Sequence, residues 1–226
     1  MRVSAEQDKR FLQSDVLSLG PHGFEGAAAV GNSPVNLSVT GVILSGGRGT
    51  RMGGMDKGLL PFRGRSLVEW VLDVIEPQVA EVLISANQNL DRYLAFGHPV
   101  LTDRVAGFAG PLAGLHAGLC LARSDLVIMV PCDSPFLPAN LVQRMTQVLL
   151  SSEADVAVAR TGAQCHPVFC LCRASVLAHL TAFLEAGGRK VDAWYAALNV
   201  CEVAFDDHAG GLLNINTLEQ LQALER

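Results

Sequence analysis

The stretch GVILSGGRGTRMGGMDKGLLPFRGR, residues 41–65, decides the fold of this chain. It opens on an apolar, β-branched run that predicts a strand, TGVILS, over residues 40–45. A loop of glycines and basic residues follows at once, and it includes Arg48, Arg51 and Lys57. Glycines let a backbone approach a ligand and align its N–H groups into an anion-binding concavity. We therefore expect a phosphate site at the end of a buried strand.

The order of strand and then helix repeats beyond this loop. A helix is predicted from Ser66, because SLVE fits a capping box. Three further strands, each leading into a helical pattern, are predicted in the segments EVLIS (81–85), PVLTD (99–103) and LVIMVP (126–131). Successive βα units of this kind predict a mostly parallel sheet with helices on both faces, which is a Rossmann-like three-layer α/β/α fold.

The second half of the chain has a looser rhythm. Strands are expected in DVAVA, HPVFCL and CEVAF, and helices in SVLAHLTAFLEAG, VDAWYAAL and TLEQLQALE. The last helix is expected to be capped by Thr217 together with Gln220. This part of the sheet should be mixed, with an antiparallel element.

The domain organisation follows from these patterns. Residues 1–38 lack periodicity and are rich in Gly, Ala, Ser and Pro, so we expect a flexible, disordered leader. Residues 39–226 are expected to form a single domain. Its nucleotide-binding half is predicted over residues 39–152 and its acceptor-substrate half over residues 153–226.

Composition excludes several classes of function. The 226 residues are 50% hydrophobic, enough for one core, and the net charge of −5 gives no basic field for nucleic acid or a membrane surface. Apolar runs are too short to span a bilayer and the start resembles no secretory signal, so the expected location is cytoplasmic. The cysteines lack paired spacing, which favours reduced core thiols over zinc or disulfides.

The first loop matches neither of two common phosphate-binding motifs. Lys57 is followed by Gly58, where a Walker A loop needs Ser or Thr, and the spacing after Gly49 reaches Met52, where the dinucleotide fingerprint needs glycine. Kinase, ATPase and dehydrogenase interpretations lose their main support. The remaining alternative to a phosphate site is a surface loop with solvated arginines.

Two carboxylates follow predicted strands at the same edge of the sheet. They are Asp103, after the third strand, and Asp133 in PCDSP, after the fourth. Such residues can hold Mg²⁺, which uses one or two carboxylates with substrate phosphates and water. Helix capping or turn formation is the alternative, and it competes more seriously for Asp103.

Glycines recur every fourth residue in AGPLAGLHAG, at Gly110, Gly114 and Gly118. They bring backbone amides near a ligand or let the helix pack closely on the sheet. Both roles can hold together, with the first glycine in the site and the later ones in packing.

Together, LSGGRGTRMGGMDKGLL, GPLAGL, PCDSPFLP, HPVFCL, GGRKV and NINT resemble the molybdenum cofactor guanylyltransferase family, called MobA. The resemblance runs from about residue 41 to the end of the chain. The first motif is shared by many nucleotidyltransferases, and the later motifs narrow the class. The resemblance implies GMP transfer from GTP to molybdenum-molybdopterin (Mo-MPT), which gives the guanine dinucleotide cofactor and pyrophosphate with Mg²⁺.

The resemblance also implies roles for individual residues. The nucleotide-binding set would be Leu44, Ser45, Gly46, Gly47, Lys57, Ser85, Asp103, Gly110 and Asp133. The catalytic set would be Arg51, Lys57 and Asp133, with Asp133 on the metal. Some members carry asparagine where Ser85 stands, and Asn87 follows two residues later, so the polar contact there is open. The acceptor would meet Arg189, Lys190, Asn214 and Asn216, whose alternative roles are capping and surface charge.

Rival functions stay open from the sequence. A sister enzyme would use CTP on the same cofactor, and a more distant one would act on a sugar phosphate. A non-catalytic GTP-binding adaptor is a third alternative, against which Lys57 and Asp133 argue. Expected partners are GTP and Mo-MPT, with cofactor-biosynthetic proteins and recipient molybdoenzymes beyond them.

Overall fold

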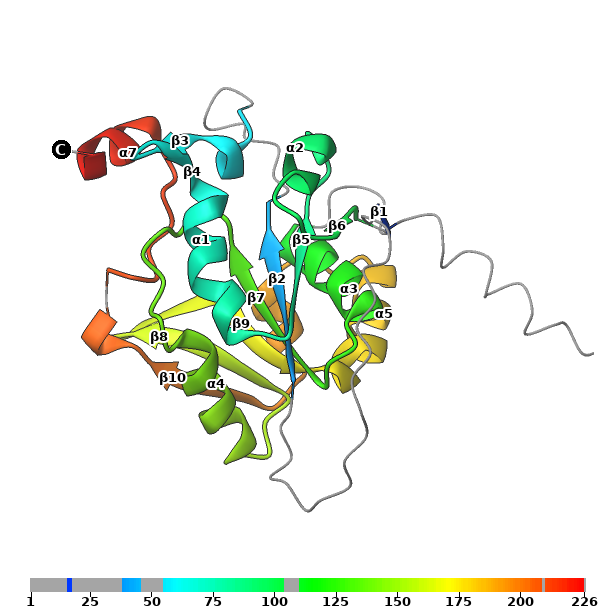
Figure 1. The fold of residues 1–226 in the computed structure, drawn as a ribbon. Coiled ribbons are helices and arrows are strands. Elements are labelled where there is room, and N and C mark those ends of the chain that lie inside the picture. Colours follow the sequence, from blue (N-terminus) through cyan, green and yellow to red (C-terminus); the bar gives the residue numbers. More distant parts are fainter. Residues whose placement is uncertain (1–15, 18–37, 46–54, 104–109, 209, 226) are drawn as a thin grey trace, which may run out of the picture.

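The computed structural model describes residues 16–17, 38–45, 55–103, 110–208 and 210–225 (Figure 1). The expected leader, residues 1–38, lies outside the described residues apart from residues 16–17 and 38. Residues 16–17 form the short strand β1 (Val16–Leu17). Within the described residues, no helix has both the length and the apolar character needed to cross a membrane.

One mixed sheet forms the centre of the fold. Its strands, in spatial order, are β1, β6 (Val100–Leu101), β5 (Glu81–Ser85), β2 (Val39–Leu44), β7 (Leu126–Pro131), β9 (Gln164–Arg173), β8 (Val156–Thr161) and β10 (Val200–Ala204). A separate two-stranded ribbon pairs β3 (Pro61–Phe62) with β4 (Arg65–Ser66).

The directions of the strands confirm the predicted parallel half and mixed half. β2 is parallel to β5 and to β7, and β5 is parallel to β6. β9 runs antiparallel to β7 and β8, and β10 returns parallel to β8. The chain builds outward from β2 on one side and then crosses to β7 on the other. Ligands of open α/β sheets bind where the strand order reverses in this way, outside the carboxyl ends of the strands.

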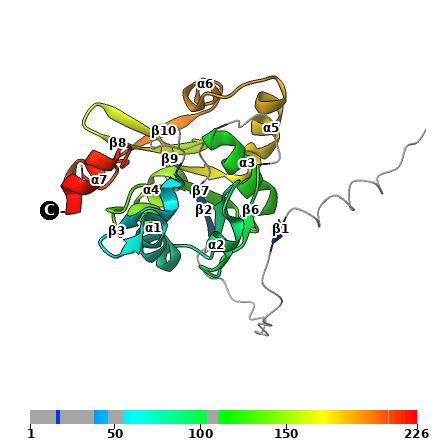
Figure 2. The ribbon, with the colours of Figure 1, turned by 90° about the horizontal axis from the view of Figure 1, so that it is seen from above.

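Helices cover both faces of the sheet (Figures 1 and 2). One apolar core joins the sheet to α1 (Leu67–Ile75), α2 (Leu90–Leu94) and α4 (Leu141–Leu150). The other joins it to α3 (Pro111–Leu121), α5 (Leu177–Glu185) and α6 (Val191–Tyr195). Alternate residues of β7 enter opposite cores, Ile128 the first and Met129 the second. The three-layer prediction is confirmed.

Two capping boxes define helix starts as the sequence predicted. At α1, the Ser66 backbone N–H donates to Glu69 Oε2 over 2.7 Å. At α7 (Leu218–Glu225), the Gln220 N–H donates to Thr217 Oγ1 over 3.1 Å, and the Thr217 N–H donates to Gln220 Oε1 over 3.2 Å. Each box satisfies backbone donors that the first turn of a helix leaves without an intrahelical partner.

Glycines bring α3 close to the sheet. A Cβ on Gly114 would come within 2.6 Å of Ser85 Oγ, and a Cβ on Gly118 would collide with the Val42 side chain. Gly110, just before the helix, has φ +70°, a value that favours glycine. The small residues therefore set the start of α3 directly beside the ends of β2 and β5.

Candidate functional site

A cavity of about 330 Å³ lies at the carboxyl ends of the parallel strands. It is in the size range of small-molecule sites, and it stands where the strand order reverses. Its walls come from the segments that follow β2, β5, β6 and β7, from the start of α3, from β9 and from the approach to α7. The lining residues are Leu44, Ser45, Lys57, Ser85, Asp103, Gly110, Pro111, Gly114, Pro131, Cys132, Asp133, Val168 and Asn214.

A lysine and an aspartate face each other on the cavity wall. Lys57 begins a short 3-10 turn, Lys57–Leu59, and Asp133 follows β7. Lys57 Nζ lies 3.1 Å from Asp133 Oδ2, with 26% of the lysine side chain and 9% of the aspartate side chain exposed. The aspartate is nearly buried and the lysine is partly exposed, so removing the lysine leaves a buried carboxylate without its cation.

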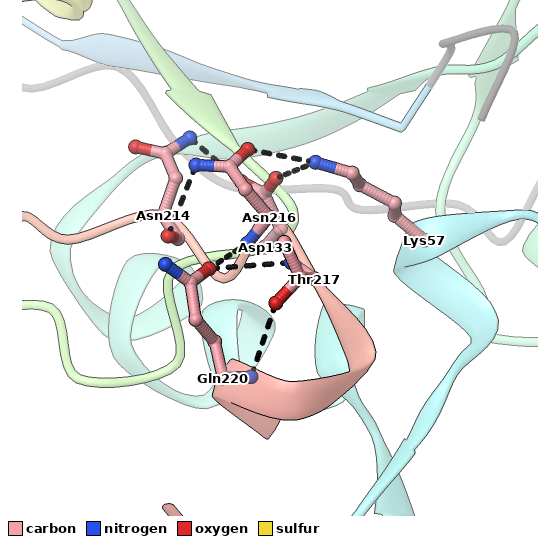
Figure 3. A network of polar contacts seen from close by, with 6 residues as sticks. All are labelled: Lys57, Asp133, Asn214, Asn216, Thr217 and Gln220. Atoms are coloured by element: carbon pink, nitrogen blue, oxygen red, sulfur yellow. Dashed lines mark hydrogen bonds and ion pairs between the residues drawn. The ribbon is translucent and has the colours of Figure 1, made fainter. Parts of the chain in front are cut away.

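The segment before α7, near the C-terminal end of the chain, forms hydrogen bonds with both Lys57 and Asp133 (Figure 3). Asn214 Nδ2 donates to Asp133 Oδ1 over 2.8 Å, and Lys57 Nζ donates to Asn216 Oδ1 over 2.9 Å. The Ile215 backbone N–H donates to the Asp133 carbonyl oxygen over 2.8 Å. Asn214 and Asn216, expected to meet the acceptor, therefore contact the lysine and aspartate directly.

The residue before Lys57 is anchored to α2. Asp56 accepts from the Tyr93 hydroxyl over 2.5 Å and from Asn89 Nδ2 over 2.9 Å. Tyr93 is fully buried, and burial is the main reason that its pKa is raised. The sequence analysis missed this anchor, because a contact across 37 residues leaves no local pattern.

Gly58 explains the departure from the Walker A pattern. A Cβ at this position would lie 2.5 Å from Tyr93 Oη and 3.2 Å from Cys132 Sγ. Neither serine nor threonine fits there without moving the tyrosine. The turn that carries Lys57 is thus packed against α2 and the strand end that carries Asp133.

Asp103 is the second carboxylate of the cavity, and Asn87 holds it. Asn87 Nδ2 donates to Asp103 Oδ2, and the Asp103 backbone N–H donates to Asn87 Oδ1, both over 2.9 Å. Burial raises the pKa of Asp103, and the hydrogen bond from Asn87 opposes that rise. Ser85 itself lines the cavity and is buried. Of Ser85 and Asn87, only Ser85 is among the residues that line the cavity. Asn87 instead contacts Asp103.

Not all of the expected site residues are placed on the cavity wall. Gly46, Gly47 and Arg51 fall outside the described residues. Arg189 and Lys190 stand between α5 and α6 and are not among the residues that line the cavity. The Arg189 guanidinium donates to the carbonyl oxygens of Leu184 and Gly188.

The six cysteines are free thiols. Cys132, Cys170 and Cys172 are buried, and burial raises the pKa of each of them. Cys165 is exposed. The expectation of core thiols therefore holds for the three buried cysteines and is wrong for Cys165, which lies near the hairpin turn that joins β8 to β9.

The donors on the cavity wall suit a phosphate compound together with a divalent cation. Asp133 supplies one carboxylate, and Mg²⁺ uses one or two carboxylates with phosphate oxygens and water. Lys57 supplies an ammonium that can neutralise a phosphate, and Gly110, at the start of α3, lets the backbone lie close to the cavity. We therefore judge that these residues fit a metal–phosphate complex.

Comparisons with known proteins show which family and which fold this chain resembles. The model of the MobA-like NTP transferase domain matches residues 41–200. A protein of Cupriavidus metallidurans named molybdenum cofactor guanylyltransferase is 48% identical over 192 residues, which cover 83% of this chain and 94% of the relative. Among solved structures, molybdopterin-guanine dinucleotide biosynthesis protein A from Archaeoglobus fulgidus superposes with a TM-score of 0.69 at 22% identity, over 82% of this chain and 96% of that one. The Rv0371c protein of Mycobacterium tuberculosis, in complex with manganese, gives 0.63 at 20% identity, over 83% and 98%.

Proposed function

Since the chain belongs to the MobA-like NTP transferase family, we propose that it transfers GMP from GTP to Mo-MPT, releasing pyrophosphate. The observation that carries the reaction class is the Lys57–Asp133 pair on the wall of the cavity. The choice of GTP and Mo-MPT rests on the relative that is 48% identical and named for this activity.

The reaction joins two anions. A terminal phosphate oxygen of Mo-MPT attacks the α-phosphorus of GTP, and the bond from that phosphorus to the bridging oxygen of the β-phosphate breaks. The acceptor phosphate is largely ionised near pH 7, since the second pKa of a phosphate monoester is about 6, so no side chain has to remove a proton. The barrier is mainly electrostatic repulsion and alignment.

The side chains that line the cavity are proposed to lower that barrier. Lys57 neutralises the phosphates of GTP from its fixed place beside β7, and Arg51 is proposed to assist it. Asp133 is proposed to hold a divalent cation, Mg²⁺, which on binding would stabilise negative charge on the transferring phosphate. Leu44, Ser45, Ser85 and Gly110, with Gly46 and Gly47 of the first loop, are proposed to line the nucleotide.

The acceptor is proposed to lie over residues 153–226. Asn214 lines the nucleotide cavity and also a second, mainly apolar cavity of about 600 Å³ beside α7. Because the two cavities share this residue, an acceptor in the second can extend a phosphate toward the first. Arg189 and Lys190 line neither cavity, and their proposed contact with the acceptor rests on the family resemblance alone. The cytoplasm is the proposed location.

A direct test measures pyrophosphate release with each of GTP, CTP, ATP and UTP, with and without Mo-MPT. Release is expected with GTP only, and only in the presence of Mo-MPT. Release with CTP in place of GTP would identify the sister activity. Tight GTP binding without release would identify the adaptor, and release with a sugar phosphate in place of Mo-MPT would identify the more distant transferase.

The pH dependence of GTP binding should change when Asn87 is replaced by leucine. Asp103 is proposed to accept from nucleotide hydroxyls, and it accepts most strongly in its ionised form. Burial raises its pKa and the Asn87 hydrogen bond lowers it, so Asn87→Leu should raise that pKa further. The fall in GTP affinity on acidification (the acidic limb) should therefore begin at a higher pH in Asn87→Leu than in the wild type. In alkaline solution the two proteins should bind GTP equally.

Titration of GTP binding across pH checks this shift. Asp103→Asn serves as the control, because it should lose the acidic limb altogether. An unchanged limb in Asn87→Leu would mean that Asp103 is not the titrating group.

A further inference from the structure

The position of the Lys57 ammonium is set by oxygens from two distant parts of the chain (Figure 3). Lys57 Nζ donates to Asp133 Oδ2 over 3.1 Å and to Asn216 Oδ1 over 2.9 Å. An ammonium carries three N–H groups, and these two contacts use two of them. A flexible lysine stem is thereby fixed at its tip. Among the described residues no other acceptor contacts the ammonium, so its third N–H can reach a ligand in the cavity.

Asn216 is not held in place by burial, since it is exposed. Its backbone is fixed instead by Gln220, whose Oε1 accepts from the Asn216 N–H over 2.7 Å and from the Thr217 N–H over 3.2 Å. One side-chain oxygen therefore sets the direction of two consecutive peptide groups.

Gln220 stands on a firmly anchored element. It lies in the first turn of α7, and its backbone N–H donates to Thr217 Oγ1 over 3.1 Å. The next residue, Leu221, is buried in one apolar cluster with Ile215 and Phe62. This packing fixes the segment on both sides of Asn216.

We infer that Gln220 is a positioning residue for Lys57 and acts through Asn216. Among the described residues Gln220 makes no hydrogen bond to the lysine, and its side chain orients the backbone that presents Asn216 Oδ1 to the ammonium. The inference deepens the proposed function, because it rests on Lys57 binding the phosphates of GTP. Gln220 also lines the second cavity, so a direct contact with the acceptor is the competing explanation.

The experiment compares Gln220→Ala and Gln220→Glu with the control Gln222→Ala. Gln222 is exposed on the same helix and, in the part of the chain that the structure describes, makes none of the hydrogen bonds of this network. The first readout is the Kd for GTP with Mg²⁺ and without acceptor. Gln220→Ala should weaken binding roughly 3–10-fold, the range expected for loss of one hydrogen bond. Gln220→Glu keeps the accepting oxygen and should restore wild-type affinity, and Gln222→Ala should match the wild type.

The second readout is coupling to the lysine. If Gln220 acts through Lys57, Gln220→Ala should have no further effect on GTP affinity in the Lys57→Met background. Thermal unfolding is measured for every variant. If Gln220→Ala lowers Tm strongly, Gln220→Met, which keeps the length of the side chain and removes its oxygen, takes its place.

Three results would overturn the inference. They are equal GTP affinities in Gln220→Ala and Gln222→Ala, a change confined to the KM for the acceptor, or a loss of affinity that persists in the Lys57→Met background. Failure of the proposed function looks different. In that case the wild type releases no pyrophosphate from GTP and Mo-MPT, while the comparison of GTP affinities still decides the role of Gln220.

Discussion

Replacement of Asp133 by asparagine should lower pyrophosphate release from GTP and Mo-MPT by about 10²–10³-fold. The change removes the carboxylate proposed to hold Mg²⁺ while keeping the size of the side chain. Asp133 accepts from Lys57 at one oxygen and from Asn214 at the other. An asparagine offers one accepting oxygen and one NH₂ group, so one of these two donors must then face another donor.

Steady-state rates at several Mg²⁺ concentrations check this prediction. The half-maximal Mg²⁺ concentration should rise together with the loss of rate. Asp73→Asn is the matched control, because Asp73 pairs with Arg65 over 2.6 Å at an exposed site away from the cavity. A fully active Asp133→Asn protein would refute the proposed mechanism.

Replacement of Lys57 by methionine should reduce kcat/KM for GTP by about 10²–10³-fold, which corresponds to about 3–4 kcal/mol of transition-state stabilisation. Methionine keeps an unbranched stem and removes the charge. Asp133 then loses its cation, and Asn216 Oδ1 loses a donor. The variant should therefore attract the phosphates of GTP less strongly, and the carboxylate of Asp133 is left without its positive partner.

The measurement separates kcat from KM and includes the Kd for GTP without acceptor. Arg144→Met is the control, since Arg144 pairs with Asp207 over 2.9 Å on the surface, where such pairs contribute little to stability. Wild-type kcat/KM in Lys57→Met would show that the ammonium takes no part in the reaction.

The sequence predicted the sheet and the side of it that carries the site, for a physical reason. Buried strands such as LVIMVP and capped helix starts such as SLVE are local patterns. The structure forms both of them, as β7 and as the start of α1. Residues that end or follow parallel strands meet at one edge, so Leu44, Ser85, Asp103 and Asp133 line one cavity.

The contacts within the site were beyond such reasoning. Nothing local to Asn216 indicates a bond to Lys57, because 159 residues separate them. The fixing of Asp103 by Asn87 depends on how closely β5 and β6 end beside each other, which the sequence left open. Gly58 showed only that the loop is not a Walker A loop, and its physical cause became visible with Tyr93 and Cys132 packed against it.

The long separation between Lys57 and Asn216 also has a consequence for biosynthesis. A ribosome adds about 5–20 residues per second, so Asn216 is synthesised roughly 10–30 s after Lys57. From about the middle of that interval the emerging chain can carry the glycine-rich loop, β2 and β7, yet the lysine lacks its second oxygen partner. The nascent protein therefore completes the polar network around Lys57 and Asp133 only near the end of translation, when the segment that leads into α7 reaches the sheet edge.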